Sequence, residues 1–388
     1  MKHRRLTPLF LALLLALGCS SAETPSPPPS AEATATPPPV EHAVFRSKAY
    51  EIDRVYRSMR GPQARQEVRL GDPEDPQLVW ITGYRSRIAD PATSQVLSPE
   101  FMCHSNLSFS DRSGAEQDTG STISQDRLFT LSQGQMEVSF PEGFGIPVVT
   151  TNPLYLDTQV LNLNAQEEPL RVRHETTVSF VRDEDLETPM RPLFQASAQA
   201  FVARNADEAH FGVENPDEAV HGAGCSVGMP AGRLRFEDEF GQVFAAHWIV
   251  EPGRHVTRTL ATEWMDLPFD TKAHFIAIHL HPYAESLELR DLTTGETVFK
   301  STTRQSEGRT GLEHVETYSS AEGIALYADH QYELITIYDN TSDRNQDAMA
   351  VMFLYLEDKQ FRNFESPTDF GTSQSRLSRP NATNEPSA

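Results

Sequence analysis

The chain has 388 residues, of which 55 are acidic and 33 are basic, so its formal net charge at pH 7 is −22. Such an excess of negative charge repels nucleic acids and anionic lipid surfaces. We therefore expect no surface that binds their phosphate groups. The length exceeds that of one ordinary hydrophobic core and suits two domains.

The first residues have the pattern of a bacterial export signal. Basic residues at positions 2, 4 and 5 precede the apolar run 9–17, which has roughly half of the ~20 residues that a membrane-spanning helix needs. The run ends in Leu-Ala-Leu-Gly-Cys at 15–19, which resembles the lipobox of bacterial lipoproteins. This resemblance implies cleavage before Cys19 and a diacylglycerol anchor on its thiol. We therefore expect an exported protein, lipid-anchored in the cell envelope and most simply at the outer membrane; the alternative is an ordinary secretory signal with an incidental cysteine.

Composition divides the rest of the chain. Stretches rich in Pro, Ser, Ala and Thr bury little apolar surface, so they predict a disordered tether after Cys19 and a disordered tail at the end of the chain. A polar, acidic stretch near the middle predicts a boundary between two folded domains. The predicted division is a signal peptide at 1–18, a lipidated linker at 19–44, an N-terminal domain at 45–204, an acidic linker at 205–224, a C-terminal domain at 225–359 and a tail at 360–388.

Short strand-like runs recur through both folded parts, and no segment keeps a helical period. The clearest run is 348–356, where Met349 and Val351 alternate with Ala350 and Met352 as a strand requires. The fold prediction is all-β, with two antiparallel β-sandwich domains of the jelly-roll kind. The predicted strands are 77–83, 106–109, 135–140, 159–163, 175–181, 243–250, 274–280, 286–292, 296–300, 331–339 and 348–356.

A His-x-His pair ends one of these strands. Alternate residues of a strand share a face, so His279 and His281 project together while Ile278 and Leu280 point to the other side. Two neighbouring imidazoles are suitable ligands for copper or zinc, and a third, soft ligand favours copper. The alternative is an exposed or locally hydrogen-bonded pair without a metal.

The second half resembles the C-terminal domain of the copper type II, ascorbate-dependent monooxygenases, the family of the peptidylglycine and dopamine hydroxylases. Three stretches carry the resemblance, namely 248–253, 274–291 and 338–356 with Tyr-Asp-Asn at 338–340 and Asp-Ala-Met at 347–349. The resemblance implies that His279, His281 and Met349 hold the copper at which that family binds and activates oxygen. Taken alone, Met349 fits better as a core methionine that opens the last strand.

The first half resembles the N-terminal domain of the same family more distantly. Cys103 and His104 stand where the family has two adjacent histidine ligands, and the family's third histidine is replaced at Leu161 or Asn162. Only His104 carries over, so this second copper site is degenerate. Cys103 is compatible with ligation of soft copper, a disulfide to Cys225 or a buried thiol. His174, beside Arg173, is expected at the surface, and His247, His255, His314 and His330 are expected to be structural or exposed.

The resemblance thus predicts an exported lipoprotein that holds one copper ion, with a second ion in doubt. As an enzyme it would hydroxylate a C–H bond of a small molecule or peptide with an external reductant such as ascorbate. Because the site that stores the second electron is degenerate, the alternative is a non-catalytic copper-binding or structural surface protein.

Overall fold

The computed structural model describes residues 37–361 apart from 57, 59, 73, 110–126, 167, 205–234 and 238–240. The predicted signal, Cys19, most of the tether, the acidic linker, Cys225 and nearly all of the tail lie outside these residues. Contacts divide the chain into two units, and the second of them, Pro38–Ala388, is a compact unit that contains both predicted domains.

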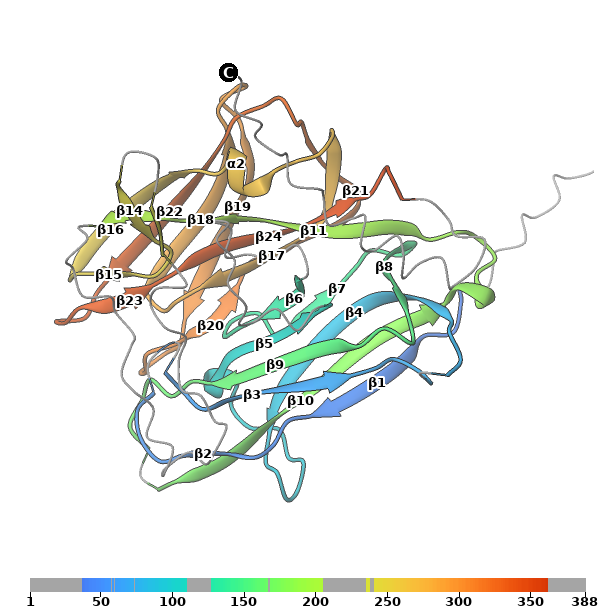
Figure 1. The fold of residues 1–388 in the computed structure, drawn as a ribbon. Helices are drawn as coiled ribbons and strands as arrows, with labels where there is room; N and C mark the ends of the chain where they lie inside the picture. The colour runs from blue at the N-terminus through green and yellow to red at the C-terminus, as the bar shows by residue number, and fades with distance from the viewer. Residues whose placement is uncertain are drawn as a thin grey trace, which may run out of the picture. The chain divides into compact units, whose positions relative to one another are not determined.

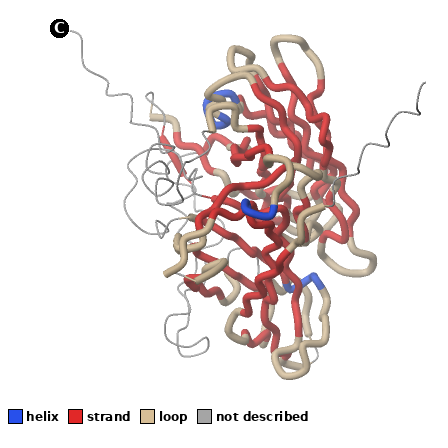
Figure 2. The backbone as a smooth tube through the Cα atoms, turned by 90° about the vertical axis from the view of Figure 1, so that its right-hand side faces the viewer, coloured by secondary structure: helices blue, strands red, loops and turns tan. Residues whose placement is uncertain are grey.

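Strands dominate the described residues, and the few helices are single turns (Figures 1 and 2). The strands of the first half are β1 (Glu41–Arg46), β2 (Tyr50–Ile52), β3 (Gln63–Val68), β4 (Leu78–Ala89), β5 (Met102–Ser108), β6 (Arg127–Leu131), β7 (Glu137–Ser139), β8 (Phe144–Val149), β9 (Leu154–Val160), β10 (Leu170–Arg182), β11 (Arg191–Gln199) and β12 (Val202–Arg204). The strands of the second half are β13 (Arg235–Glu237), β14 (Val243–Ala245), β15 (Trp248–Val250), β16 (Gly253–Leu260), β17 (Thr271–Leu280), β18 (Ala284–Asp291), β19 (Thr297–Gln305), β20 (Leu312–Val315), β21 (Tyr318–Leu326), β22 (Tyr332–Asn340), β23 (Gln346–Ala348) and β24 (Ala350–Glu357). The helical turns are η1 (Pro99–Phe101), η2 (Asp183–Asp185) and α2 (Thr262–Met265).

The all-β prediction is confirmed. A long sheet runs in the order β1-β10-β4-β8-β11-β24-β17-β21 and contains strands from both halves. Its pairings are antiparallel except for a short parallel contact between β8 and β11. A four-stranded sheet, β3-β9-β5-β6, lies in the first half, and a five-stranded sheet, β16-β22-β18-β19-β20, lies in the second.

Strands β17 and β24 have two buried faces, and each face packs against a different hydrophobic core. Phe275, Ala277 and Val351 belong to the core cluster of the first half, together with Phe353 and Tyr355. Their neighbours of opposite parity, including Ile276, Ile278 and Met352, belong to the core cluster of the second half. The two strands therefore form a wall between the cores, and the strand period directs alternate residues to the two halves.

The register of this wall places the predicted ligands. His279 pairs with Val351 and Leu280 with Ala350. Beyond them the hydroxyl of Tyr338 accepts from the N–H of His281 and donates to the carbonyl of Met349. Directly opposite residues of an antiparallel pair project from the same face. His279, His281 and Met349 therefore share the face that is turned toward the first half, and Met352 lies on the other face as predicted.

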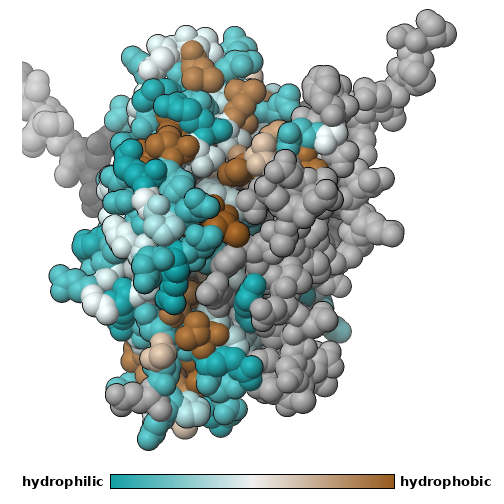
Figure 3. Space-filling view, turned by 90° about the vertical axis from the view of Figure 1, so that its left-hand side faces the viewer, coloured by the Kyte–Doolittle hydropathy of each residue, from teal (hydrophilic) through white to brown (hydrophobic). Residues whose placement is uncertain are grey.

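The outer face shown in Figure 3 is mainly hydrophilic, with apolar residues scattered over it. Few large apolar residues are exposed in the described part of the chain, and Val96, Val256 and Leu260 are among them. No helix among the described residues is long and apolar enough to cross a membrane.

Candidate metal centre

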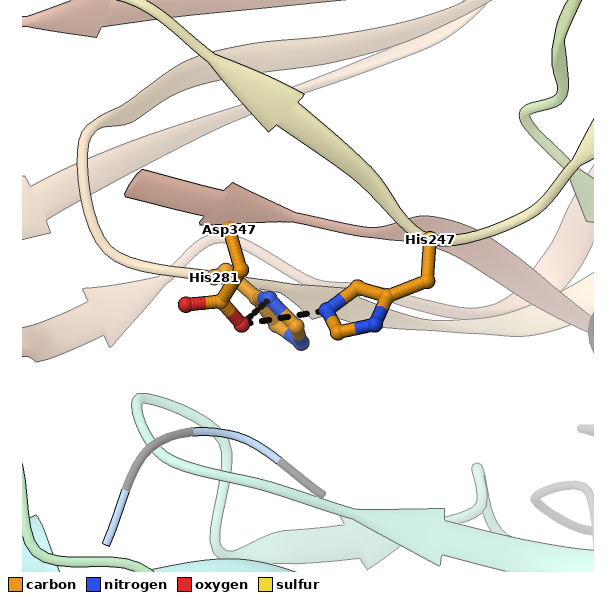
Figure 4. A group of neighbouring side chains, drawn as sticks. All are labelled: His247, His281 and Asp347. Atoms are coloured by element: carbon orange, nitrogen blue, oxygen red, sulfur yellow. Dashed lines mark hydrogen bonds and ion pairs between the residues drawn. The ribbon is translucent and has the colours of Figure 1, made fainter. Parts of the chain in front are cut away.

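Three buried side chains from separate segments converge at the end of β17. His281 follows the last residue of this strand, Asp347 is the central residue of β23, and His247 lies in the short link between β14 and β15. Strand β15 pairs with β23, with Ile249 opposite Asp347, and this pairing brings the link carrying His247 beside the carboxylate. Figure 4 shows the two rings and the carboxylate pointing toward one another.

The geometry of the group centres on one carboxylate oxygen. Oδ2 of Asp347 lies 3.1 Å from Nε2 of His247 and 3.0 Å from Nδ1 of His281. The contact between His247 and Asp347 has hydrogen-bond geometry. The contact between Nδ1 of His281 and Asp347 is equally short but does not have hydrogen-bond geometry. All three ligand atoms lie within 4.8 Å of one another, so the group could hold a metal ion. Two ligands at ~2.1 Å from an ion and at about a right angle to each other are about 3 Å apart, which matches these separations.

Burial and the contacts within the group together determine the charges of His247 and Asp347. His247, His281 and Asp347 are 6%, 4% and 7% exposed. Burial lowers the pKa of His247 below its ordinary value despite the adjoining carboxylate. Burial would raise the pKa of Asp347, but the contacts with His281 and His247 outweigh it and hold that pKa well below the usual range. A neutral imidazole beside an ionised carboxylate is the protonation state that metal ligation requires.

His279 lies beside this group and faces the first half. Its ring centroid is 5.2 Å from that of His281 and 5.0 Å from that of His104, which belongs to β5. It is 4% exposed, and neither ring nitrogen has a hydrogen-bond partner. Burial, followed by the neighbouring imidazoles, lowers its pKa well below the ordinary value. A buried imidazole without a partner costs free energy that a bound ion would recover.

A contact from Ser58 and a small cavity adjoin the group. Ser58 Oγ lies 3.0 Å from Nε2 of His281, and Ser58 is itself buried. Ser58, His279, His281, Asp347 and Gln346 line one cavity, so the imidazoles border it.

The predicted ligands have different surroundings. His281 belongs to the three-residue group, and His279 adjoins it. Met349 is partly buried and packs against the core of the first half, while its backbone carbonyl accepts a hydrogen bond from Tyr338 Oη at 2.7 Å. Its role as a copper ligand stays a prediction, as does the pairing of Cys103 with Cys225, which lies outside the described residues.

One expectation about histidines was incomplete and one was wrong. His247, expected to be structural or exposed, is buried, and the prediction did not foresee that it is one of the three converging groups. Its position in an irregular link hides it from any strand pattern, and a sequence offers no signal that this link adjoins β23. His174, expected at the surface, is fully buried with its ring 6.0 Å from and perpendicular to that of Tyr50.

No family model matches this chain, and no curated protein matches it. Among solved structures it is similar to two peptide-N(4)-(N-acetyl-β-D-glucosaminyl)asparagine amidase structures. One has 8% identity over 81% of this chain and 98% of that chain with a TM-score of 0.32; the other, titled PNGase F, has 8% identity over 83% and 97% with a TM-score of 0.33. The major capsid protein P2 of bacteriophage PM2 has 10% identity over 82% of this chain and 100% of that chain, with a TM-score of 0.28. Likeness at this level carries no argument about function.

Proposed function

We propose that this protein is an exported, lipid-anchored protein that binds a copper ion through His247, His281 and Asp347. The anchor is the lipid that the lipobox-like sequence places on Cys19. The observation that carries the metal proposal is the approach of one buried carboxylate oxygen to two imidazole nitrogens from different segments, at 3.1 and 3.0 Å.

The donor set favours a transition metal over a hard cation. Calcium and magnesium prefer oxygen ligands, whereas imidazole suits copper, zinc, iron and nickel. Among divalent first-row ions, copper binds a given nitrogen and oxygen site most tightly. Met349 packs against the core of the first half, and a thioether ligand from it, as the family resemblance implies, would strengthen the preference for copper.

A second candidate function is copper-dependent hydroxylation of a C–H bond. The likeness of His279, His281 and Met349 to the oxygen-activating copper ligands of the resembled family supports it, and the two histidines border one cavity. Copper supplies one-electron redox chemistry when it is bound. The chain's own part is to supply the imidazoles and an ionised Asp347, while the electrons come from an external reductant such as ascorbate.

The experiment that tests copper binding is metal analysis of the purified chain after loading with copper, combined with electron paramagnetic resonance. We expect at least one equivalent of copper with a type 2 spectrum in the wild type, and loss of that signal in His281→Ala and His247→Ala. His255→Ala is the matched control, because this half-buried imidazole in β16 hydrogen-bonds the carbonyl of Glu251 and is not part of the converging group. Copper binding at background level, or preferential retention of zinc in competition, would overturn the copper assignment.

Oxygen consumption separates the two candidates. With ascorbate present, a hydroxylase consumes oxygen in step with a hydroxylated product, whereas a binding protein shows only the slow background of copper cycling. The comparison is made against His281→Ala loaded under the same conditions.

A further inference from the structure

Strand β22 directs two buried polar side chains at the segments that carry the proposed copper ligands. Tyr338 and Asn340 are alternate residues near the end of this strand, so they project from the same face. Each is 1% exposed, and Tyr338 belongs to the core cluster of the second half. Neither is a member of the converging group of His247, His281 and Asp347. Their contacts therefore concern the main chain that supports this group.

The hydroxyl of Tyr338 joins two segments at the point where their strand pairing ends. The last pair in the register of β17 with β24 is Leu280 with Ala350. Just beyond this pair, Tyr338 Oη accepts a hydrogen bond from the N–H of His281 at 3.0 Å and donates one to the carbonyl of Met349 at 2.7 Å. One hydroxyl therefore satisfies two main-chain groups and fixes the spacing of the two strand ends.

Asn340 makes equivalent contacts with two further segments. Its Nδ2 donates to the carbonyl of Val250, the last residue of β15, at 3.0 Å and to the carbonyl of Arg344 at 2.8 Å. Its Oδ1 accepts from the N–H and from the hydroxyl of Ser342 at 3.1 and 2.6 Å. A primary amide donates two hydrogen bonds and accepts two, so every hydrogen-bonding position of this side chain is used.

Together these contacts reach every segment of the centre. Tyr338 holds His281 itself and the chain shortly after Asp347. Asn340 holds β15, which begins directly after His247, and the loop that leads into β23 with Asp347. Ligand groups have to be held within about 0.5 Å of their productive geometry, and supporting hydrogen bonds provide that precision.

We propose that Tyr338 and Asn340 are positioning residues of the copper centre, which hold His247, His281 and Asp347 at ligand distances before an ion arrives. This inference rests on the copper centre proposed above. Preorganisation strengthens binding because the ligands are already ordered in the folded chain. Loss of a supporting contact weakens metal binding by about 10-fold or more, although the ligand atoms themselves are unchanged.

The test compares two variants of β22 that keep the aromatic ring. Tyr338→Phe removes the hydroxyl beside the centre. Tyr332→Phe is the matched control, because Tyr332 is also 1% exposed and its hydroxyl also bridges main-chain groups, the N–H and the carbonyl of Tyr327 at 2.8 and 3.1 Å. Tyr332 lies at the other end of the strand, about 20 Å away. Both variants lose a comparable pair of hydrogen bonds, so a purely structural role would lower stability in both and leave copper binding unchanged.

The readouts are the copper Kd, measured by competition with a chelator, and the electron paramagnetic resonance spectrum. We expect the Kd to rise about 10-fold in Tyr338→Phe, with an altered copper hyperfine splitting, and to keep its wild-type value in Tyr332→Phe. Asn340→Ala gives an independent reading through the other two segments, and the same direction of change is expected. An unchanged Kd in Tyr338→Phe, or equal rises in both tyrosine variants, would overturn the positioning role.

A measurement without metal separates this inference from the proposed function. In the crystal structure of metal-free Tyr338→Phe, we expect the separation of Nδ1 of His281 and Oδ2 of Asp347 to exceed about 3.5 Å. In Tyr332→Phe it should stay at 3.0 Å. An unchanged separation in Tyr338→Phe would contradict the positioning role even if copper binds. A wild type that binds no copper would contradict the proposed centre, and the metal-free geometry would still decide whether Tyr338 positions these side chains.

Discussion

Nδ1 of His281, which follows β17, lies 3.0 Å from Oδ2 of Asp347 in β23, and this contact lacks hydrogen-bond geometry. The same oxygen accepts from Nε2 of His247 at 3.1 Å. Because the carboxylate is buried and ionised, it supplies the negative charge that a cation in this place would need.

Asp347→Asn removes that charge and keeps the size of the side chain. We expect copper to raise the thermal midpoint of the wild type clearly, because a ligand that binds only the native state at 1,000 times its Kd stabilises it by about 4 kcal/mol. The rise should be much smaller in Asp347→Asn. Differential scanning calorimetry with and without copper measures the rise in both proteins. Equal rises in both proteins would remove Asp347 from the ligands.

Part of this centre was accessible from the sequence. The alternation of residues in β17 and β24 fixed the common face of His279, His281 and Met349 and placed Met352 on the other, because the strand period is strict. His247 and Asp347 could not be assigned as partners. Their meeting depends on the short pairing of β15 with β23, and no local pattern encodes which distant segments pair.

The fold was predicted with the same strengths and weaknesses. The runs that became β17 and β24 are nearly continuous apolar segments, as strands buried on both faces require, and they were found together with the runs of β10 and β22. The predicted strand at 159–163 was wrong, since β9 ends at Val160. The predicted strand at 243–250 is two strands, β14 and β15, separated by a short link that contains His247. Strands β1, β3 and β16 were missed because their outward residues are polar or exposed and the alternation is incomplete.

Ser58 should set the affinity of the centre without binding the ion. Metal ligation by Nδ1 of His281 requires the ring proton to be on Nε2, and Ser58 Oγ lies 3.0 Å from Nε2, where it can accept that proton and hold the Nδ1 lone pair toward Asp347. Loss of such an outer contact weakens metal binding by about 10-fold or more. We therefore expect a copper Kd about 10-fold higher in Ser58→Ala, measured by competition with a chelator, and no change in the exposed control Ser319→Ala. An unchanged Kd in Ser58→Ala would show that the hydroxyl does not orient the ring.

Glu175 provides a prediction about stability that is independent of any metal. Its carboxylate is 2% exposed and contacts three arginines, Arg46 at 3.1 Å, Arg87 at 2.7 Å and Arg173 at 2.6 Å. Burial would raise its pKa, but the hydrogen bonds from Arg87, Arg173 and Arg46 lower it from 4.5 to about 2. A lowered carboxyl pKa stabilises the fold above pH 4.5, and this contribution is lost as the pH falls through about 2.

Glu175→Gln should therefore lower the free energy of unfolding by about 2 kcal/mol at pH 7, a value reduced for the solvent screening of the half-exposed arginines. The difference from the wild type should shrink as the pH falls from 4.5 toward 2. Urea unfolding across this range measures it, with the exposed Glu137→Gln as control. A difference that does not depend on pH would mean that packing, not charge, accounts for the loss.

His174 should have the opposite kind of effect, because it is a base that the fold holds neutral. It is fully buried, neither ring nitrogen has a hydrogen bond of normal geometry, and burial lowers its pKa from 6.5 to about 3. Between these two values the unfolded chain binds a proton that the native protein does not. Folding stability therefore falls with decreasing pH by about 1.4 kcal/mol per pH unit on account of this residue.

His174→Leu removes the titrating group and fills the space beside Tyr50 with apolar atoms. We expect the free energy of unfolding at pH 7 to change little, since an unsatisfied polar group is lost with the ring. Between pH 6 and pH 4 the variant should lose stability less steeply than the wild type by about 1.4 kcal/mol per pH unit. Urea unfolding with a chelator present keeps metal ligation out of the comparison. If the unfolding free energies of the wild type and the variant changed with pH in parallel, His174 would be protonated in the native protein or in contact with water. The assignment of a buried, neutral imidazole at this position would then be wrong.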